Sequence, residues 1–181
     1  MATFKELTDF FQQVGATDVA HTKKSYLAHA IGVYNDLKQW GASEELALGG
    51  MFHSIYGTER FQKFKLDLER RDDVRALIGE RAEWLAWINC AMTRDEYDAC
   101  IEALIEDESA PLYLVDRFSG DRIELSVQDF DDLGTIHLCD WLEQVGRSED
   151  WSYRRHVYEY LANRFAGAAL ASFHEVYGER V

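Results

Sequence analysis

Three side chains that can bind a metal ion stand in apolar stretches of this sequence. His29 and His53 lie in LAHAIG and GMFHSI, and Asp140 lies in HLCDWL. A buried carboxylate costs free energy unless it is paired or bound to a metal. Two imidazoles and a carboxylate are a donor set that suits a divalent metal, which can activate water or oxygen. The sequence therefore predicts that these three residues meet at one polar centre and hold a divalent metal, with Fe, Mn, Mg and Zn left open.

Three further residues are candidates for the same centre. His21 precedes His29 by eight residues, about two turns along one face of an expected helix, and can be a fourth ligand. Glu59 lies six residues after His53 in the turn YGTE and can act as an extra ligand or a base. Arg60 can hold an anionic group. An alternative for His21 is a residue that lines the pocket, and the plainer interpretation of Glu59 is a solvated loop acid.

The elements that must position these residues are helices. Apolar residues at helical spacing, with capping residues at the starts, predict eight of them. Ser43 and Ser126 are expected N-caps, and Thr93 with Glu96 forms an expected capping box. His29 falls within the second helix, His53 near the end of the third, and Asp140 within the seventh. The expected helices cover about residues 4–14, 22–40, 44–56, 68–78, 80–91, 94–105, 127–145 and 152–177.

The only strand signal is LYLVDRFSGDRIELS, in which two short runs flank the turn residues Ser119, Gly120 and Asp121. We expect one small β-hairpin there. The stretch 56–64, which starts beside Gly57 and mixes charged with aromatic residues, is expected to form the rim of a pocket. We therefore predict one all-α domain over residues 1–181, a bundle of about seven or eight helices with one hairpin.

Composition restricts the partners. The formal net charge of −14 disfavours nucleic acid, because the chain repels polyanions at long range. No apolar run approaches the ~20 residues of a membrane span, and the N-terminus lacks a secretory signal pattern. Three cysteines without CxxC spacing are expected to be buried, reduced thiols in a cytoplasmic protein. The expected partner is a small-molecule substrate, and a homodimer is left open.

The three proposed ligands carry a resemblance. A histidine, a second one about two dozen residues later near a helix end, and a distant aspartate in a helix ending Leu-Glu resemble the HD-domain superfamily. The stretches WGASEELALGGMFHSIYGTERF, RALIGERAEWL and IHLCDWLEQ resemble an uncharacterised HD-like family with His-Ser in place of His-Asp. The resemblance spans roughly residues 20–145 and places His29, His53 and Asp140 at the ligand positions. It implies an all-α fold with one or two divalent metals, phosphate ester or anhydride hydrolysis in most members, and iron-dependent oxygenation in a minority.

Ser54 departs from the superfamily pattern, because it stands where the second histidine is normally followed by aspartate. A neutral hydroxyl weakens a single metal site and removes the bridging carboxylate of a two-metal site. The remaining donors have the composition of a two-His-one-carboxylate triad with open positions. Three functions therefore stay open: a metal-dependent phosphohydrolase acting on a small molecule, which we favour, a non-haem iron oxygenase, and a non-catalytic binding or scaffold protein with a degenerate site.

Overall fold

The fold is all-α, as the sequence predicts. The computed structural model describes residues 2–17, 19–21, 23–148 and 150–178. Within these residues the chain forms nine α-helices, one short 3-10 helix and two small β-hairpins. The elements, in chain order, are α1 (Phe4–Gln13), β1 (Ala20–His21), β2 (Lys24–Ser25), α2 (Tyr26–Gln39), α3 (Glu44–Met51), η1 (Leu68–Arg70), α4 (Arg71–Ile78), α5 (Glu80–Ala91), α6 (Arg94–Glu106), β3 (Tyr113–Val115), β4 (Arg122–Glu124), α7 (Val127–Val145), α8 (Arg155–Phe165) and α9 (Gly167–Tyr177).

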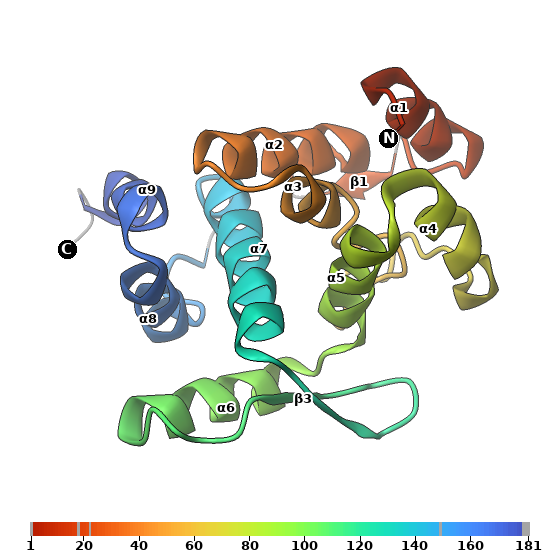
Figure 1. Cartoon of the computed structure of the whole chain (residues 1–181). Coiled ribbons are helices and arrows are strands. Elements are labelled where there is room, and N and C mark those ends of the chain that lie inside the picture. The colour runs from red at the N-terminus through yellow and green to blue at the C-terminus, as the bar shows by residue number, and fades with distance from the viewer. Residues whose placement is uncertain (1, 18, 22, 149, 179–181) are drawn as a thin grey trace.

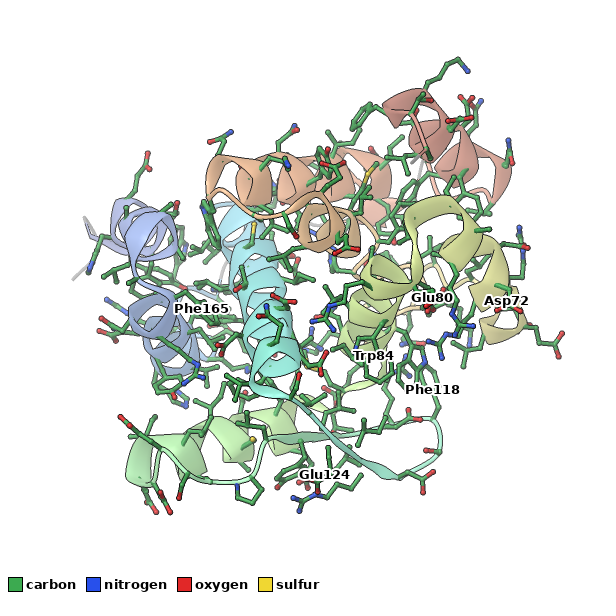
Figure 2. The ribbon with its side chains drawn as sticks, viewed as in Figure 1. Asp72, Glu80, Trp84, Phe118, Glu124 and Phe165 are labelled. Atoms are coloured by element: carbon green, nitrogen blue, oxygen red, sulfur yellow. The ribbon has the colours of Figure 1, made fainter. Side chains whose placement is uncertain are left out.

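Helix α7 is the central element. It packs against α2, α3 and α5, and α2 and α5 also pack on α3. Figure 1 shows α8 and α9 on one side of α7, α4 and α5 on the other, and α6 with the β3–β4 hairpin at one end. Side chains fill the spaces between the ribbons in Figure 2, where Phe165 of α8 lies beside α7. Gly134 of α7 allows this approach, because a Cβ there would lie 2.8 Å from the Phe165 ring.

The helices that carry the proposed ligands begin at serine caps. The hydroxyls of Ser25, Ser43 and Ser126 accept hydrogen bonds from backbone N–H groups in the first turns of α2, α3 and α7. Each cap satisfies a donor that has no partner within the helix. The predicted caps Ser43 and Ser126 are confirmed, so local sequence sets where two of the three ligand-bearing segments start.

Three helix boundaries differ from the prediction. Helix α3 ends at Met51 and not near Tyr56, so His53 lies in the turn after it. Helix α2 begins at Tyr26 because the preceding residues form the β1–β2 hairpin; Thr22, the expected start, lies outside the described residues. The expected last helix is two helices, α8 and α9. Ala166 and Gly167 have φ of 54° and 49°, which breaks the helical hydrogen-bond pattern between them. This division brings the number of α-helices in the described residues to nine.

The predicted hairpin is confirmed. Strands β3 and β4 pair antiparallel with Leu114 opposite Ile123, and Gly120 in the turn has φ of 81°. All three cysteines are buried and free. Among the described helices, none combines the length and apolar character needed to cross a membrane.

Candidate metal centre

Helix α2 and the chain after α3 bring two histidines to one point. His29 is fully buried on α2, and its Nε2 atom lies 3.0 Å from Oδ1 of Asp140 on α7. His53 follows the C-cap of α3, and its Nε2 atom lies 3.4 Å from the same oxygen. Potential ligand atoms of all three residues lie within 4.8 Å of one another. The prediction that these three residues converge is confirmed.

The spacing of these atoms suits a metal ion. Ligands bonded at ~2.1 Å lie about 3.0 Å apart at right angles and about 3.4 Å apart in a tetrahedron. The Nε2 atom of His29 is buried and makes no well-oriented hydrogen bond with any described residue, although it lies 3.0 Å from Asp140. A buried nitrogen without a hydrogen-bond partner, directed at a carboxylate and a second imidazole, fits a metal ligand.

Contacts on the far side of each imidazole leave Nε2 free to bind a metal. The Nδ1 atom of His53 lies 2.7 Å from the Gly50 carbonyl oxygen, which can only accept, so this contact selects the tautomer that carries its proton on Nδ1. The Nδ1 atom of His29 lies 2.5 Å from a carboxylate oxygen of Glu143. Such a carboxylate–histidine pair orients a metal-ligating ring and raises its basicity.

Glu143 is a site residue that the sequence analysis did not identify. It lies three residues after Asp140 on α7 and therefore on the same face of the helix. Its carboxylate also pairs with Lys24 and Arg147, each at 2.6 Å. Gly32 leaves room for it, because a Cβ at Gly32 would lie 2.8 Å from Oε1 of Glu143. The signal in the sequence was the three-residue spacing of Asp140 and Glu143. This spacing indicates a shared helix face but does not identify His29 as the partner of Glu143.

These contacts shift the pKa values of His29, Asp140 and Glu143. Burial disfavours the imidazolium of His29, but the carboxylates of Asp140 and Glu143 outweigh it and raise the pKa of His29 to about 9. Burial opposes ionisation of Asp140, yet His53 and His29 hold its pKa well below the ordinary value. Burial also opposes ionisation of Glu143, but His29, Lys24 and Arg147 lower its pKa to about 2. A cation at this centre, either a proton or a metal, is therefore strongly favoured.

His21 reaches the centre by a different route from the one expected. It lies in β1 and not on α2, so the expectation of a shared helical face with His29 is wrong. The β1–β2 hairpin instead stacks the ring of His21 on that of His29, with centroids 4.2 Å apart and planes 9° apart. Burial, followed by the charge of His29, lowers the pKa of His21 to about 4. His21 is outside the set of three converging ligands and lines the adjoining cavity.

Glu59 has a different partner from the one expected. Its carboxylate accepts a hydrogen bond from the backbone N–H of Arg94 at 3.1 Å, and so caps helix α6. The expected capping box is absent, because Thr93 makes no side-chain cap, and its buried hydroxyl has no hydrogen-bond partner among the described residues. The structure places the Glu59 carboxylate at α6 and not with the three ligands, in contrast to the expected extra ligand or base.

A cavity of about 270 Å³ opens beside the three ligands. The expected rim loop contributes Thr58, Arg60, Phe61 and Lys63 to its wall. Ser54 also lines it, and the buried Ser54 hydroxyl makes no hydrogen bond of good geometry with any described residue. Arg60 additionally lines a second cavity, of about 250 Å³, and its guanidinium lies 4.6 Å from the Tyr153 ring centroid. The three ligands thus face space that a small molecule can enter, with a cation at its edge.

Comparison with known proteins adds a family model but no function. Residues 10–94, a little under half of the chain, match the model of a domain of unknown function, DUF6817. The matched segment includes His21, His29 and His53, while Asp140 and Glu143 lie beyond it. No curated protein and no solved structure matches the chain. The chain is therefore similar, over the segment that supplies both histidine ligands, to a family whose activity has not been assigned.

Proposed function

We propose that this protein is a metal-dependent phosphohydrolase with one metal ion, acting on a small anionic molecule. The observation that carries the proposal is the convergence of His29, His53 and Asp140 at a cavity that Arg60 also lines. A divalent metal bound there would lower the pKa of a water molecule toward ~7 and polarise a phosphoryl oxygen.

The residues around the metal position have separate tasks in this proposal. Glu143 and the Gly50 carbonyl hold the two imidazoles with Nε2 directed at the metal. Gln144 donates a hydrogen bond at 2.8 Å to Oδ1 of Asp140 and fixes the carboxylate. Arg60 binds the anionic group of the substrate. Ser54 supplies no negative charge, which favours one metal over two.

A second candidate is a non-haem iron oxygenase. Two imidazoles and one carboxylate are the donor set of iron(II) sites that keep open positions for oxygen and substrate. A third is a binding protein without catalysis, which the neutral Ser54 favours. These alternatives differ in the metal that co-purifies and in the reaction that follows loading with it.

The test is phosphate release by protein loaded separately with Mn²⁺, Mg²⁺, Zn²⁺ or Fe²⁺, using a panel of small phosphate monoesters. We expect turnover that Asp140→Asn abolishes. The matched control is Asp131→Asn, whose carboxylate pairs with Arg164 away from the ligands, and it should retain turnover. Oxygen uptake only with iron would favour the oxygenase. Binding of metal without either reaction would favour the non-catalytic protein.

A further inference from the structure

Arg94 is a largely buried cation that is only loosely paired with a carboxylate among the described residues. Its side chain is 13% exposed, and its nearest carboxylate oxygen, on Glu59, lies 3.7 Å from Nη1. The buried Nε atom has no hydrogen-bond partner among the described residues. A guanidinium carries five N–H donors, so most of its hydrogen-bonding capacity is unused. A buried charge with so few partners is costly unless a ligand completes its contacts.

Two other arginines of this chain show how a carboxylate compensates the burial of a guanidinium group. Arg154, 8% exposed, makes a two-pronged contact with the carboxylate of Asp98. Arg71 makes the equivalent contact with buried Glu83, at 2.6 and 3.0 Å. Arg94 is buried to a comparable degree and has neither arrangement. Among the described residues, no carboxylate therefore satisfies the planar donors of Arg94 in this way.

The position of Arg94 identifies where that ligand would sit. Arg94, Arg60, Asp140 and Gln144 line both the cavity beside the metal ligands and the second cavity. The two cavities therefore adjoin along these four residues, two of which are arginines. Arg94 is also the first residue of α6, where the positive end of the helix adds to the positive potential.

The two cavities differ in chemistry. Lys63 lines the first cavity, next to the metal ligands, and adds a third cation there. The second cavity is lined by the aromatic residues Trp141, Tyr153 and Tyr158 and by two acids, Asp150 and Asp140, of which Asp140 also lines the first cavity. These acids disfavour a second anionic group. A volume of about 250 Å³ is below the range typical of drug-sized ligands, so a small organic group fits.

We propose that Arg94 and Arg60 bind a single phosphoryl-type oxyanion at the junction of the two cavities, and that the uncharged remainder of the ligand lies against the aromatic wall of the second. This inference rests on the proposed function for the position of the reacting group. It defines the substrate class as a small monoester with one anionic end and a neutral end. Planar guanidinium groups suit this task because each can donate two parallel hydrogen bonds to one oxyanion.

The test is calorimetric titration of the metal-free protein with inorganic phosphate. Arg94→Met and Arg60→Met should each weaken phosphate binding about tenfold or more, as expected for lost hydrogen bonds to a charged group. Arg94→Lys keeps the charge and loses the planar donors, so its phosphate affinity should lie between those of wild type and Arg94→Met. The control is Arg122→Met, which removes the same charge from the exposed β3–β4 hairpin, and should bind like wild type. Thermal unfolding of each variant verifies that it is folded.

Two further arms test the details. Glu59→Gln removes the carboxylate nearest to Arg94 and should tighten phosphate binding. Phenyl phosphate should bind more tightly than inorganic phosphate, and Tyr153→Ala should remove that advantage. Equal phosphate affinity in folded Arg94→Met and wild type, or no binding to wild type, would overturn the inference.

The outcome is separable from that of the proposed function. Phosphate binding that depends on Arg94, without ester hydrolysis under any metal, would retain the anion site and reject the hydrolase. Hydrolysis that Arg94→Met leaves unchanged would retain the hydrolase and reject the anion site.

Discussion

Replacing Glu143 with glutamine tests whether the contact behind His29 prepares this ring for metal binding. The Glu143 carboxylate is almost fully buried and lies 2.5 Å from Nδ1 of His29. It accepts a hydrogen bond from Nδ1–H and so leaves Nε2 as the nitrogen that can bind the metal. A glutamine amide is neutral, and its NH₂ group can donate to Nδ1, which would place the proton on Nε2 and block the ligand position.

The expected loss follows from this geometry. Removing a partner of this kind typically lowers metal affinity by about 10- to 100-fold, or roughly 1.4–2.8 kcal/mol. The short, buried contact favours the upper half of that range. Lys24 and Arg147 would lose their ion pair with this carboxylate too, but their side chains are 39% and 23% exposed, so they can be rehydrated. We therefore expect a loss of only about 1–2 kcal/mol in the free energy of unfolding of the metal-free protein.

Competition with a fluorescent chelator measures the affinity, and urea unfolding measures the stability. The matched control is Glu44→Gln, whose carboxylate accepts from Tyr34 at 2.8 Å and pairs with Lys38, with no histidine involved. Metal affinity should be unchanged in the control. An affinity within about twofold of wild type in folded Glu143→Gln would refute the role assigned to this contact.

Three other predictions concern the same centre. Because the pKa of His29 is raised to about 9, the stability that protonated His29 contributes to the metal-free protein is present below the unfolded pKa and is lost as pH rises through 9. Metal must displace this proton, so metal affinity should rise about tenfold per pH unit up to pH 9. Calorimetry in two buffers should measure about one proton released per metal at pH 7. Ser54→Asp should destabilise the metal-free protein, because it buries a second carboxylate near Asp140, and should tighten metal binding; unchanged binding in a chelator competition would mean that position 54 faces away from the metal. Glu59→Gln should weaken the cap of α6 by only about 0.5 kcal/mol, since the amide oxygen still accepts, and should leave metal affinity unchanged, as thermal unfolding and metal titration would report.

The three ligands could be predicted from the sequence because each is a polar residue in an apolar helical stretch. Burying such residues costs free energy unless they pair or bind a ligand, so one shared polar site was the simplest explanation for all three. Ser43, Ser126 and the turn around Gly120 were predictable for a different reason, since capping and turn formation depend on residues close in sequence.

Contacts between residues distant in sequence could not be predicted in the same way. His29 and Glu143 are 114 residues apart, and the cap that Glu59 provides for α6 joins residues 35 apart. Thr93 and Glu96 satisfy the local pattern of a capping box, but a tertiary contact replaced it. The β1–β2 hairpin places His21 against His29, and its strands of two residues each are too short to give a strand pattern in the sequence.

The stoichiometry of metal binding tests the central claim most directly. Protein stripped with chelator, reloaded with each metal and passed through a desalting column should retain about one ion per chain by elemental analysis. His53→Gln and Asp140→Asn, confirmed as folded by circular dichroism, should retain almost none, while Asp131→Asn retains the wild-type amount. Wild-type protein that retains no metal, or folded Asp140→Asn that retains a full equivalent, would contradict the assignment of His29, His53 and Asp140 as a metal centre.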